Sequence, residues 1–247
     1  MGILKTGIRV LDNALGGGIL EDTNLLIIYD TYSSGWALAF EILRNRIAEG
    51  DFGVMINSVL PFSSLRVEIN SIGFDPTEEG RRGNLAIIDM FASFYRVEYD
   101  AGFIYTDETM DAATFLPKYS HLYRRVLTEK IKDRRPIGID FTIDGMAFLL
   151  GERNFIKVFQ NLMASKEKAR LVEKRKRPIN IFLLNRDRIS SGVISWIALY
   201  SQYVIEFFSS PDSTVEKMIV RKSPLPEFSP RDGGYTFRVE HGNIVIE

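Results

Sequence analysis

Residues 6–37 decide the fold, and they read TGIRVLDNALGGGILEDTNLLIIYDTYSSGWA. Within this stretch, Asn24–Tyr29 is an apolar run of β-forming residues, which predicts a strand buried on both faces. The next six residues form a polar turn that ends at Gly35, and beyond Trp36 the apolar residues recur at helical spacing. A buried strand joined to a helix by a short polar turn is the building unit of α/β proteins.

The rest of the chain continues this alternation of strands and helices. Strands are predicted at 24–29, 52–57, 84–89, 137–143, 178–184, 203–208, 217–221, 235–239 and 243–246. Helices are predicted at 36–49, 62–72, 117–131 and 155–169. The sequence therefore predicts an α/β fold with a mostly parallel central sheet flanked by helices. The last three strands are separated only by turn residues, which predicts a C-terminal antiparallel extension. With no linker or internal repeat, residues 1–247 form a single predicted domain.

We expect a central sheet of at least seven strands, with strand 24–29 in its interior and strand 137–143 beside it. In parallel α/β sheets, ligands bind at the carboxyl ends of the strands. The turns after Tyr29, Asn57, Asp89, Ile143 and Leu184 are therefore the places to look for a functional site.

Composition excludes several classes of function. The 247 residues carry 31 Lys and Arg against 32 Asp and Glu, so no global field attracts DNA or a membrane. The absence of Cys excludes disulfides, thiolate zinc sites and cysteine nucleophiles, and two His residues 120 positions apart make a multi-His metal site untenable within one chain. The longest uncharged run, 189–205, is too short and too polar to span a bilayer. We expect a cytoplasmic protein, and the scarcity of Cys and Gln is typical of hyperthermophiles.

The opening residues 6–19 resemble the start of the RecA/KaiC superfamily of P-loop ATPases, which reads T-G-I-x-x-L-D-x-x-L-G-G-G-I. Segments 52–57 and 85–91 resemble the family's next two strands, and Asp144 fits its Walker B position. Segments 217–222 and 237–246 resemble its terminal strands. The resemblance, closest to archaeal KaiC-like proteins, spans the chain except for 97–115. It implies a RecA-like fold and a nucleotide site at the first βα turn.

The phosphate loop of that family is degenerate in this chain. A P-loop requires G-x-x-x-x-G-K-[ST], so that backbone N–H groups, a lysine and a hydroxyl surround the phosphates and Mg²⁺. The eight matching positions are Asp30, Thr31, Tyr32, Ser33, Ser34, Gly35, Trp36 and Ala37. A carboxylate about 5 Å from a phosphate charge costs about 3 kcal/mol at an effective dielectric of 20. Together with the missing lysine, this predicts a loss of roughly 10³- to 10⁴-fold in nucleotide affinity.

Other catalytic positions of the family are also replaced. The paired glutamates that follow its second strand correspond to Val59 and Leu60, which cannot accept a proton. Lys222 is followed by Ser223 and Pro224, so only part of the family's K-x-R-G-type element remains. Asp144 persists, either as a magnesium-associated residue or as a hydrogen-bonding aspartate at a strand end, and the second interpretation is favoured. We expect no catalytic residue, no bound metal and no cofactor, and ATP is the one cofactor that the resemblance leaves conceivable.

Two further stretches have both a functional and a structural interpretation. The basic run 166–177 could contact nucleic acid, or it could end a helix with cations that suit the helix dipole. It enters the strand at Pro178, on the amino edge of the sheet, and lacks aromatic residues for base stacking, so the structural interpretation is favoured. The aromatic residues between Phe91 and Tyr105 could form core or an exposed contact surface, and core is favoured.

The leading hypothesis is a catalytically inactive RecA/KaiC-like protein that binds a protein or peptide partner, or that self-associates. The alternatives are a weak ATP-binding protein or ATPase with non-standard residues, and a recombinase-type nucleic-acid accessory protein. Tyr32 and Trp36 stand where phosphates would lie and are the candidate partner-binding residues. Trp36 either plugs the vacant phosphate pocket or anchors a partner, and the plug is favoured.

Overall fold

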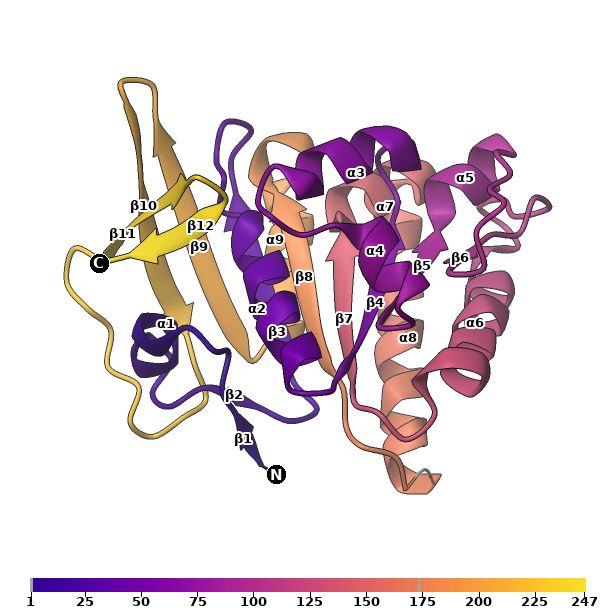
Figure 1. The fold of residues 1–247 in the computed structure, drawn as a ribbon, viewed down its shortest axis with the longest axis horizontal. Helices are drawn as coiled ribbons and strands as arrows, with labels where there is room; N and C mark the ends of the chain where they lie inside the picture. Colours follow the sequence, from indigo (N-terminus) through magenta and orange to yellow (C-terminus); the bar gives the residue numbers. More distant parts are fainter. Residues whose placement is uncertain (1, 173) are drawn as a thin grey trace.

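The computed structural model describes residues 2–172 and 174–247, which fold around a ten-stranded sheet (Figure 1). Its strands are β3 (Asn24–Tyr29), β4 (Phe52–Asn57), β5 (Leu85–Asp89), β6 (Ile104–Tyr105), β7 (Pro136–Phe141), β8 (Ile179–Asn185), β9 (Tyr203–Ser210), β10 (Ser213–Lys222), β11 (Tyr235–Glu240) and β12 (Asn243–Ile246). The strand order is β12-β11-β10-β9-β3-β8-β7-β4-β5-β6. Pairing is parallel from β9 to β6 and antiparallel from β9 to β12. Strands β1 (Ile3–Leu4) and β2 (Ile19–Leu20) form a separate antiparallel pair.

Helices cover both faces of the sheet. Around one face lie α1 (Arg9–Ala14), α2 (Ala37–Ala48), α3 (Phe62–Asn70) and α4 (Pro76–Arg81). Around the other lie α5 (Met90–Tyr95), α6 (Phe115–Val126), α7 (Ile143–Leu150), α8 (Glu152–Val172) and α9 (Ser191–Tyr200). A π-helical turn at Leu127–Ile131 extends α6, and a 3₁₀ turn at Arg186–Arg188 follows β8. Figure 1 shows α2 in front of the sheet and α8 behind it.

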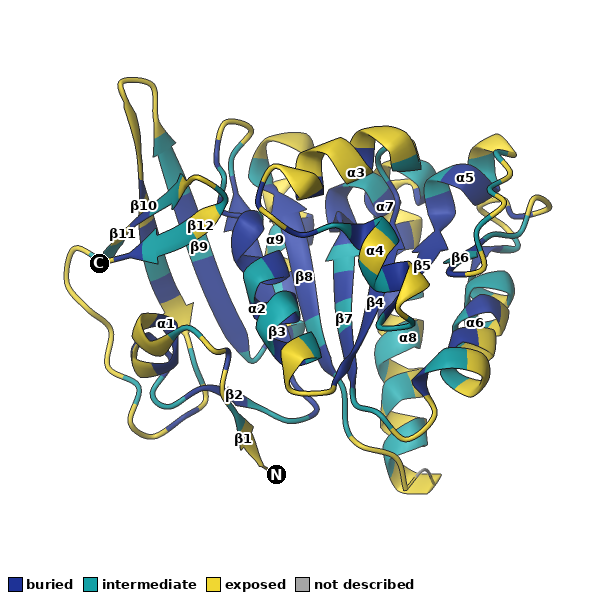
Figure 2. Ribbon diagram, viewed as in Figure 1, coloured by how far each residue is buried: buried dark blue, intermediate teal, exposed yellow. Residues whose placement is uncertain are grey.

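The strand β3 lies in the interior, with all six residues buried (Figure 2). Because side chains alternate along a strand, Leu25 and Ile27 join the core under α2, while Leu26 and Ile28 join the core under α8. The phosphate-loop segment therefore starts from a strand that is fixed on both faces, at the carboxyl edge of the sheet.

The nine predicted strands are confirmed, as are the four predicted helices, the parallel sheet and its antiparallel extension. The predicted neighbour of β3 is wrong: β8 and β9 flank β3, and β7 pairs with β4 and β8 instead. A crossover helix returns the chain to the amino edge of the sheet, and the next strand can then pair with any strand there. Consecutive strand patterns therefore do not specify which strands become neighbours.

The end of one predicted strand also changes. The strand expected at 137–143 ends at Phe141, and Ile143 and Asp144 lie in the first turn of α7. A continuous apolar run cannot be assigned to strand or helix by periodicity alone, which explains this difference. The uncharged run 189–205 contains α9 and the start of β9. Over 2–172 and 174–247, no helix combines the length and the apolar character that crossing a membrane requires.

Candidate functional site

The turn between β3 and α2 lies at the carboxyl edge, where the sequence places the degenerate phosphate loop. Helix α2 begins at Ala37, and Trp36 at its N-cap position provides no side-chain acceptor for the first turn. The first backbone amides of the loop between β3 and α2 nevertheless donate hydrogen bonds to carboxylates. Thr31 N donates to Asp187 Oδ2 at 2.8 Å, and Tyr32 N donates to Asp30 Oδ1 at 3.2 Å. Asp187 follows β8, so a carboxylate from a neighbouring strand end supports the turn.

Glu216 of β10 engages the next part of the loop. Its carboxylate accepts a hydrogen bond from Ser34 N at 2.5 Å and another from Ser33 Oγ, and Gly35 N donates to Ser33 Oγ at 3.0 Å. Burial raises the pKa of Glu216, the bonds from Ser33 and Ser34 oppose that rise, and the negative charge of Asp30 adds to it. In a P-loop these backbone donors face phosphate oxygens. In this chain they face oxygen atoms of the protein itself.

Asp30, which replaces the first glycine of the motif, fixes the loop to the neighbouring hairpin. Its carboxylate accepts hydrogen bonds from Ser209 N at 2.8 Å and Ser209 Oγ at 2.5 Å. Gly35, the one motif glycine that remains, packs against Phe207 of β9, and a Cβ at this position would overlap the Phe207 ring. Close packing accounts for this glycine without any phosphate.

Trp36 and Tyr32 differ in their surroundings. The Trp36 ring is half-buried and makes edge contacts with Phe40 at 5.9 Å and Phe141 at 6.2 Å between ring centroids. This packing favours the plug interpretation of Trp36. The Tyr32 side chain is 89% exposed and is therefore accessible to a partner. The partner-binding role of both residues stays a prediction.

Asp144 is buried in the first turn of α7 and ties that helix to the end of β8. It accepts a hydrogen bond from Asn185 N at 2.9 Å, and Arg188 Nη1 lies 3.6 Å from its Oδ2. Burial raises the pKa of Asp144, while the Asn185 amide and Arg188 oppose that rise. The geometry fits the hydrogen-bonding interpretation. Among residues 2–172 and 174–247, no group of three or more His, Asp or Glu side chains could hold a metal ion.

Val59 and Leu60, at the positions that match the family's paired glutamates, lie in a turn that is held by hydrogen bonds. Val59 and Leu60 are half-buried, and Asn57 Nδ2 donates to the Leu60 carbonyl at 2.7 Å and to Asp89 Oδ2 at 3.0 Å. Asp89 also accepts from Ala92 N at 2.7 Å at the start of α5. Burial raises the pKa of Asp89 to about 6, against the opposing effect of these bonds.

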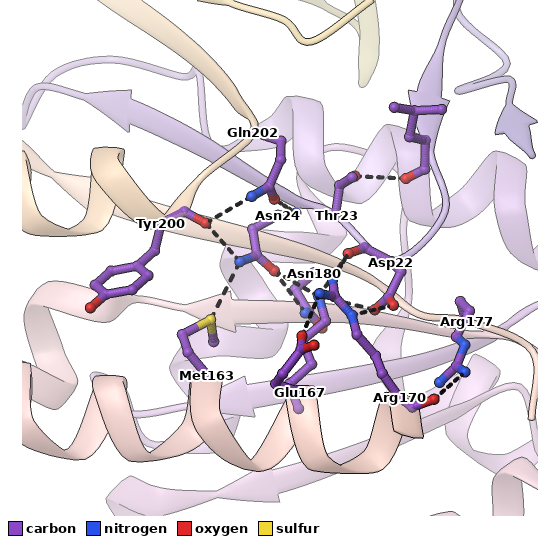
Figure 3. Close-up of polar contacts among 12 residues, drawn as sticks. Asp22, Thr23, Asn24, Met163, Glu167, Arg170, Arg177, Asn180, Tyr200 and Gln202 are labelled. Atoms are coloured by element: carbon purple, nitrogen blue, oxygen red, sulfur yellow. Dashed lines mark hydrogen bonds and ion pairs between the residues drawn. The ribbon is translucent and has the colours of Figure 1, made fainter. Parts of the chain in front are cut away.

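The basic run lies at the amino edge, as expected. Lys166 and Arg170 of α8 form ion pairs with the buried Asp22 at 3.5 Å and 2.5 Å, and Lys166 Nζ also donates to Asn24 Oδ1 at 3.1 Å. Figure 3 shows Arg170 reaching Asp22 just before β3, beside Asn24 and Asn180. These two cations anchor α8 to the sheet, which favours the structural interpretation for this part of the run.

The aromatic stretch divides between core and surface. Phe103 and Tyr105 are buried, whereas Tyr95 is 55% exposed and makes a tilted ring contact with Phe91 at 4.7 Å between centroids. Its inner residues close the edge of the sheet at β6.

Sequence reasoning identified the loop but missed the residues that fill it: Glu216, Asp187, Ser209 and Phe207. One signal was available for Glu216. Period-two alternation in β10 puts it on the same face as the buried Met218 and Val220. A carboxylate on the buried face of a strand requires a donor, and the loop provides it.

Comparisons with known proteins give no matching family model and no matching curated protein. Solved structures do match across the chain. An uncharacterized protein from Pyrococcus horikoshii, in complex with an unknown peptide, has 18% identity and a TM-score of 0.78, covering 99% of this chain and 98% of that one. A KaiC-like protein from Pyrococcus horikoshii OT3 has 19% identity and a TM-score of 0.71, covering 100% and 99%. The flagellar accessory protein FlaH from Methanocaldococcus jannaschii has 16% identity and a TM-score of 0.65, covering 100% and 99%. This chain has the RecA/KaiC-like fold that its opening motif indicates.

Proposed function

We propose that this chain is a RecA/KaiC-like protein without ATPase activity that binds a protein or peptide partner. The observation that carries the proposal is the occupation of the phosphate loop by the protein's own acceptors. Glu216, Asp187 and Asp30 accept hydrogen bonds from loop amides, and Trp36 packs where the motif lysine would stand. A nucleotide would have to displace these contacts and would meet carboxylates instead of a lysine.

Three observations support a peptide or protein as the ligand. The structural neighbour from Pyrococcus horikoshii was crystallised with an unknown peptide. In this chain, Tyr32 projects from the loop with 89% of its side chain exposed, and an aromatic side chain at a sheet edge is a typical anchor for a partner. The end strands β6 and β12 each leave one edge of the sheet unpaired, where an extended peptide could add as a further strand. A second copy of the chain could use the same surfaces.

Nucleotide titration tests the first half of the proposal. In a Trp196→Phe background, Trp36 is the one remaining tryptophan and reports directly on the loop. We expect no saturable fluorescence change with millimolar ATP and Mg²⁺, and no phosphate release above background. Phosphate release that disappears in Asp144→Ala would overturn this half.

A variant with the P-loop residues restored measures how much nucleotide affinity the natural residues of the loop remove. Asp30→Gly, Trp36→Lys and Ala37→Thr, combined with Glu216→Ala, should restore nucleotide binding measurable by calorimetry. Hydrolysis should stay at background, because the base positions still carry aliphatic side chains. The triple variant that retains Glu216 should bind more weakly than the quadruple variant.

Selection from a random peptide library tests the second half. We expect recovered peptides to bind with micromolar affinity in calorimetry, and Tyr32→Ala to weaken that binding about 30-fold. Sedimentation velocity of the free protein at increasing concentration measures self-association separately. A library that yields no binder, together with a monomer at all concentrations, would refute the binding role.

A further inference from the structure

A groove lies between α6 and α8 on the sheet face opposite α2, and it shares no residue with the loop at 30–37. Its volume is about 640 Å³, within the range of small-molecule sites. One wall comes from Tyr119, Tyr123 and Leu127, and the other comes from α8. Further apolar surface comes from residues that include Val54, Ile56, Phe155, Phe159 and Phe182.

The sheet residues under the groove, from β4 and β7, explain why this space is not filled. Val54 and Ile56 of β4 fill this face of the sheet with aliphatic side chains, but β7 contributes Gly138 and Asp140 instead. On its other face, β7 packs Ile137 and Ile139 into the core with no exposure. One face of β7 is therefore a normal apolar core surface. The face that lines the groove has no side chain at Gly138 and a carboxyl group at Asp140.

Asp140 has no hydrogen-bond or ion-pair partner in the described part of the chain, although it lies in the middle of a parallel sheet. Burial raises the pKa of Asp140 to about 7. Its charge in turn contributes to raising the pKa of Tyr119, after the larger effect of burial. A carboxyl in an apolar groove costs free energy unless it bonds to something. A perturbed carboxyl of this kind in a cleft is a signature of a ligand site.

The amino-edge end of the groove is basic. Its cationic residues include Arg124, Arg134, Lys166, Arg170 and Lys176. Lys166 and Arg170 both form ion pairs with Asp22 and hold the wall in place, as Figure 3 shows for Arg170. Arg124 and Lys176 are exposed at the rim. The surplus of positive charge at this end attracts a negatively charged group.

We propose that this groove binds a small amphipathic organic anion. Its apolar body fills the space between α6 and α8, a hydroxyl or amine group donates a hydrogen bond to Asp140, and its negative group lies at the basic end. This site is separate from the phosphate loop and does not depend on the proposed partner binding.

Two fluorescent probes of nearly the same shape test the proposal. 8-Anilinonaphthalene-1-sulfonate carries an aromatic body, an N–H donor and a negative group, and N-phenyl-1-naphthylamine lacks only the negative group. We expect one saturable site for each probe on the folded protein, with the sulfonate binding at least fivefold more tightly at low salt. High salt should reduce this preference, because it screens the charges at the rim.

Matched variants locate the site. Ala169→Phe fills the groove from α8 and should abolish binding of both probes, whereas Ala164→Phe, on the same helix outside the groove, should leave it unchanged. Lys176→Glu should weaken the sulfonate about fivefold and leave the neutral probe unaffected, whereas Lys168→Glu should change neither. A thermal melt of each variant verifies folding. Absence of saturable binding, or binding that Ala169→Phe leaves intact in a folded protein, would overturn the proposal.

Discussion

The loop at 30–37 and the groove between α6 and α8 lie on the same sheet but satisfy their polar groups in opposite ways. At the loop, the carboxylates of Asp30, Asp187 and Glu216 all accept hydrogen bonds from protein donors. In the groove, Asp140 has no such bond within the described residues. The turn after β3 is thus filled by hydrogen bonds within the protein, whereas the groove holds a carboxyl without such a bond among the described residues.

Under the proposed function, this difference shows how a nucleotide site is lost while the fold is kept. Loop amides that would face phosphate oxygens in a P-loop donate to carboxylates of the protein, so the turn keeps its hydrogen bonds. The groove has the opposite effect on stability, because the half-buried Asp140 has no hydrogen-bond or ion-pair partner among the described residues. Such residues are typical of sites that act on something outside the chain.

The largest expected destabilisation comes from removing the Trp36 ring, the proposed plug of the loop. Trp36→Ala removes ring contacts with Phe40 and Phe141 and leaves a cavity, so we expect a loss of roughly 3 kcal/mol in the free energy of unfolding. Urea denaturation measures it. Trp196→Ala is the control, because Trp196 is 42% exposed and should cost about 1 kcal/mol. Equal losses in the two variants would contradict the plug.

The next prediction is a gain in stability, and it concerns Asp140 in the groove. The pKa of Asp140 is raised from 3.8 to about 7, so between these values the folded chain binds more protons than the unfolded chain. Stability therefore falls as pH rises through this window, and the full penalty is present above pH 7. Asp140→Asn avoids the charge and should stabilise the protein by roughly 2–4 kcal/mol at alkaline pH, with almost no effect near pH 4.

Urea midpoints at the two pH values test this prediction. Asp212→Asn, at an exposed hairpin turn, is the control and should show no such change with pH. A stabilisation by Asp140→Asn that is the same at both pH values would show that shape, not charge, is responsible.

The sequence predicts the sheet and the loop well because both depend on local signals. Apolar runs identify the strands, and the opening motif identifies the turn after Tyr29. It does not predict that β8 separates β3 from β7, because pairing between distant strands leaves no local pattern. For the same reason the partners of the loop escape sequence reasoning: Glu216 lies more than 180 positions from Ser33. Asp140 reads as an ordinary strand residue until the helices above it are placed.

A smaller effect tests how the loop is filled. Glu216→Ala leaves Ser33 Oγ and Ser34 N without their acceptor and should cost roughly 1–3 kcal/mol in the free energy of unfolding. Phosphate can then reach the freed donors, so adding it should recover part of the lost stability in this variant. Thermal melts with and without phosphate measure this. Glu216→Gln keeps an acceptor oxygen and serves as the control, and an equal response of both variants to phosphate would argue against an anion site in the vacated loop.

The smallest expected effect on stability is at Tyr32, and its small size makes it informative. The Tyr32 side chain is 89% exposed, so Tyr32→Ala should change the free energy of unfolding by no more than about 0.5 kcal/mol. If Tyr32 anchors a partner, the same variant should weaken binding of a selected peptide by about 2 kcal/mol. Tyr95→Ala is the matched control, because Tyr95 is also exposed but lies on α5, away from the loop. Loss of peptide binding in Tyr95→Ala but not in Tyr32→Ala would move the partner surface to the aromatic stretch at 91–111. Loss in neither would leave the peptide at the strand edges, where hydrogen exchange of β6 and β12 identifies the one that becomes protected.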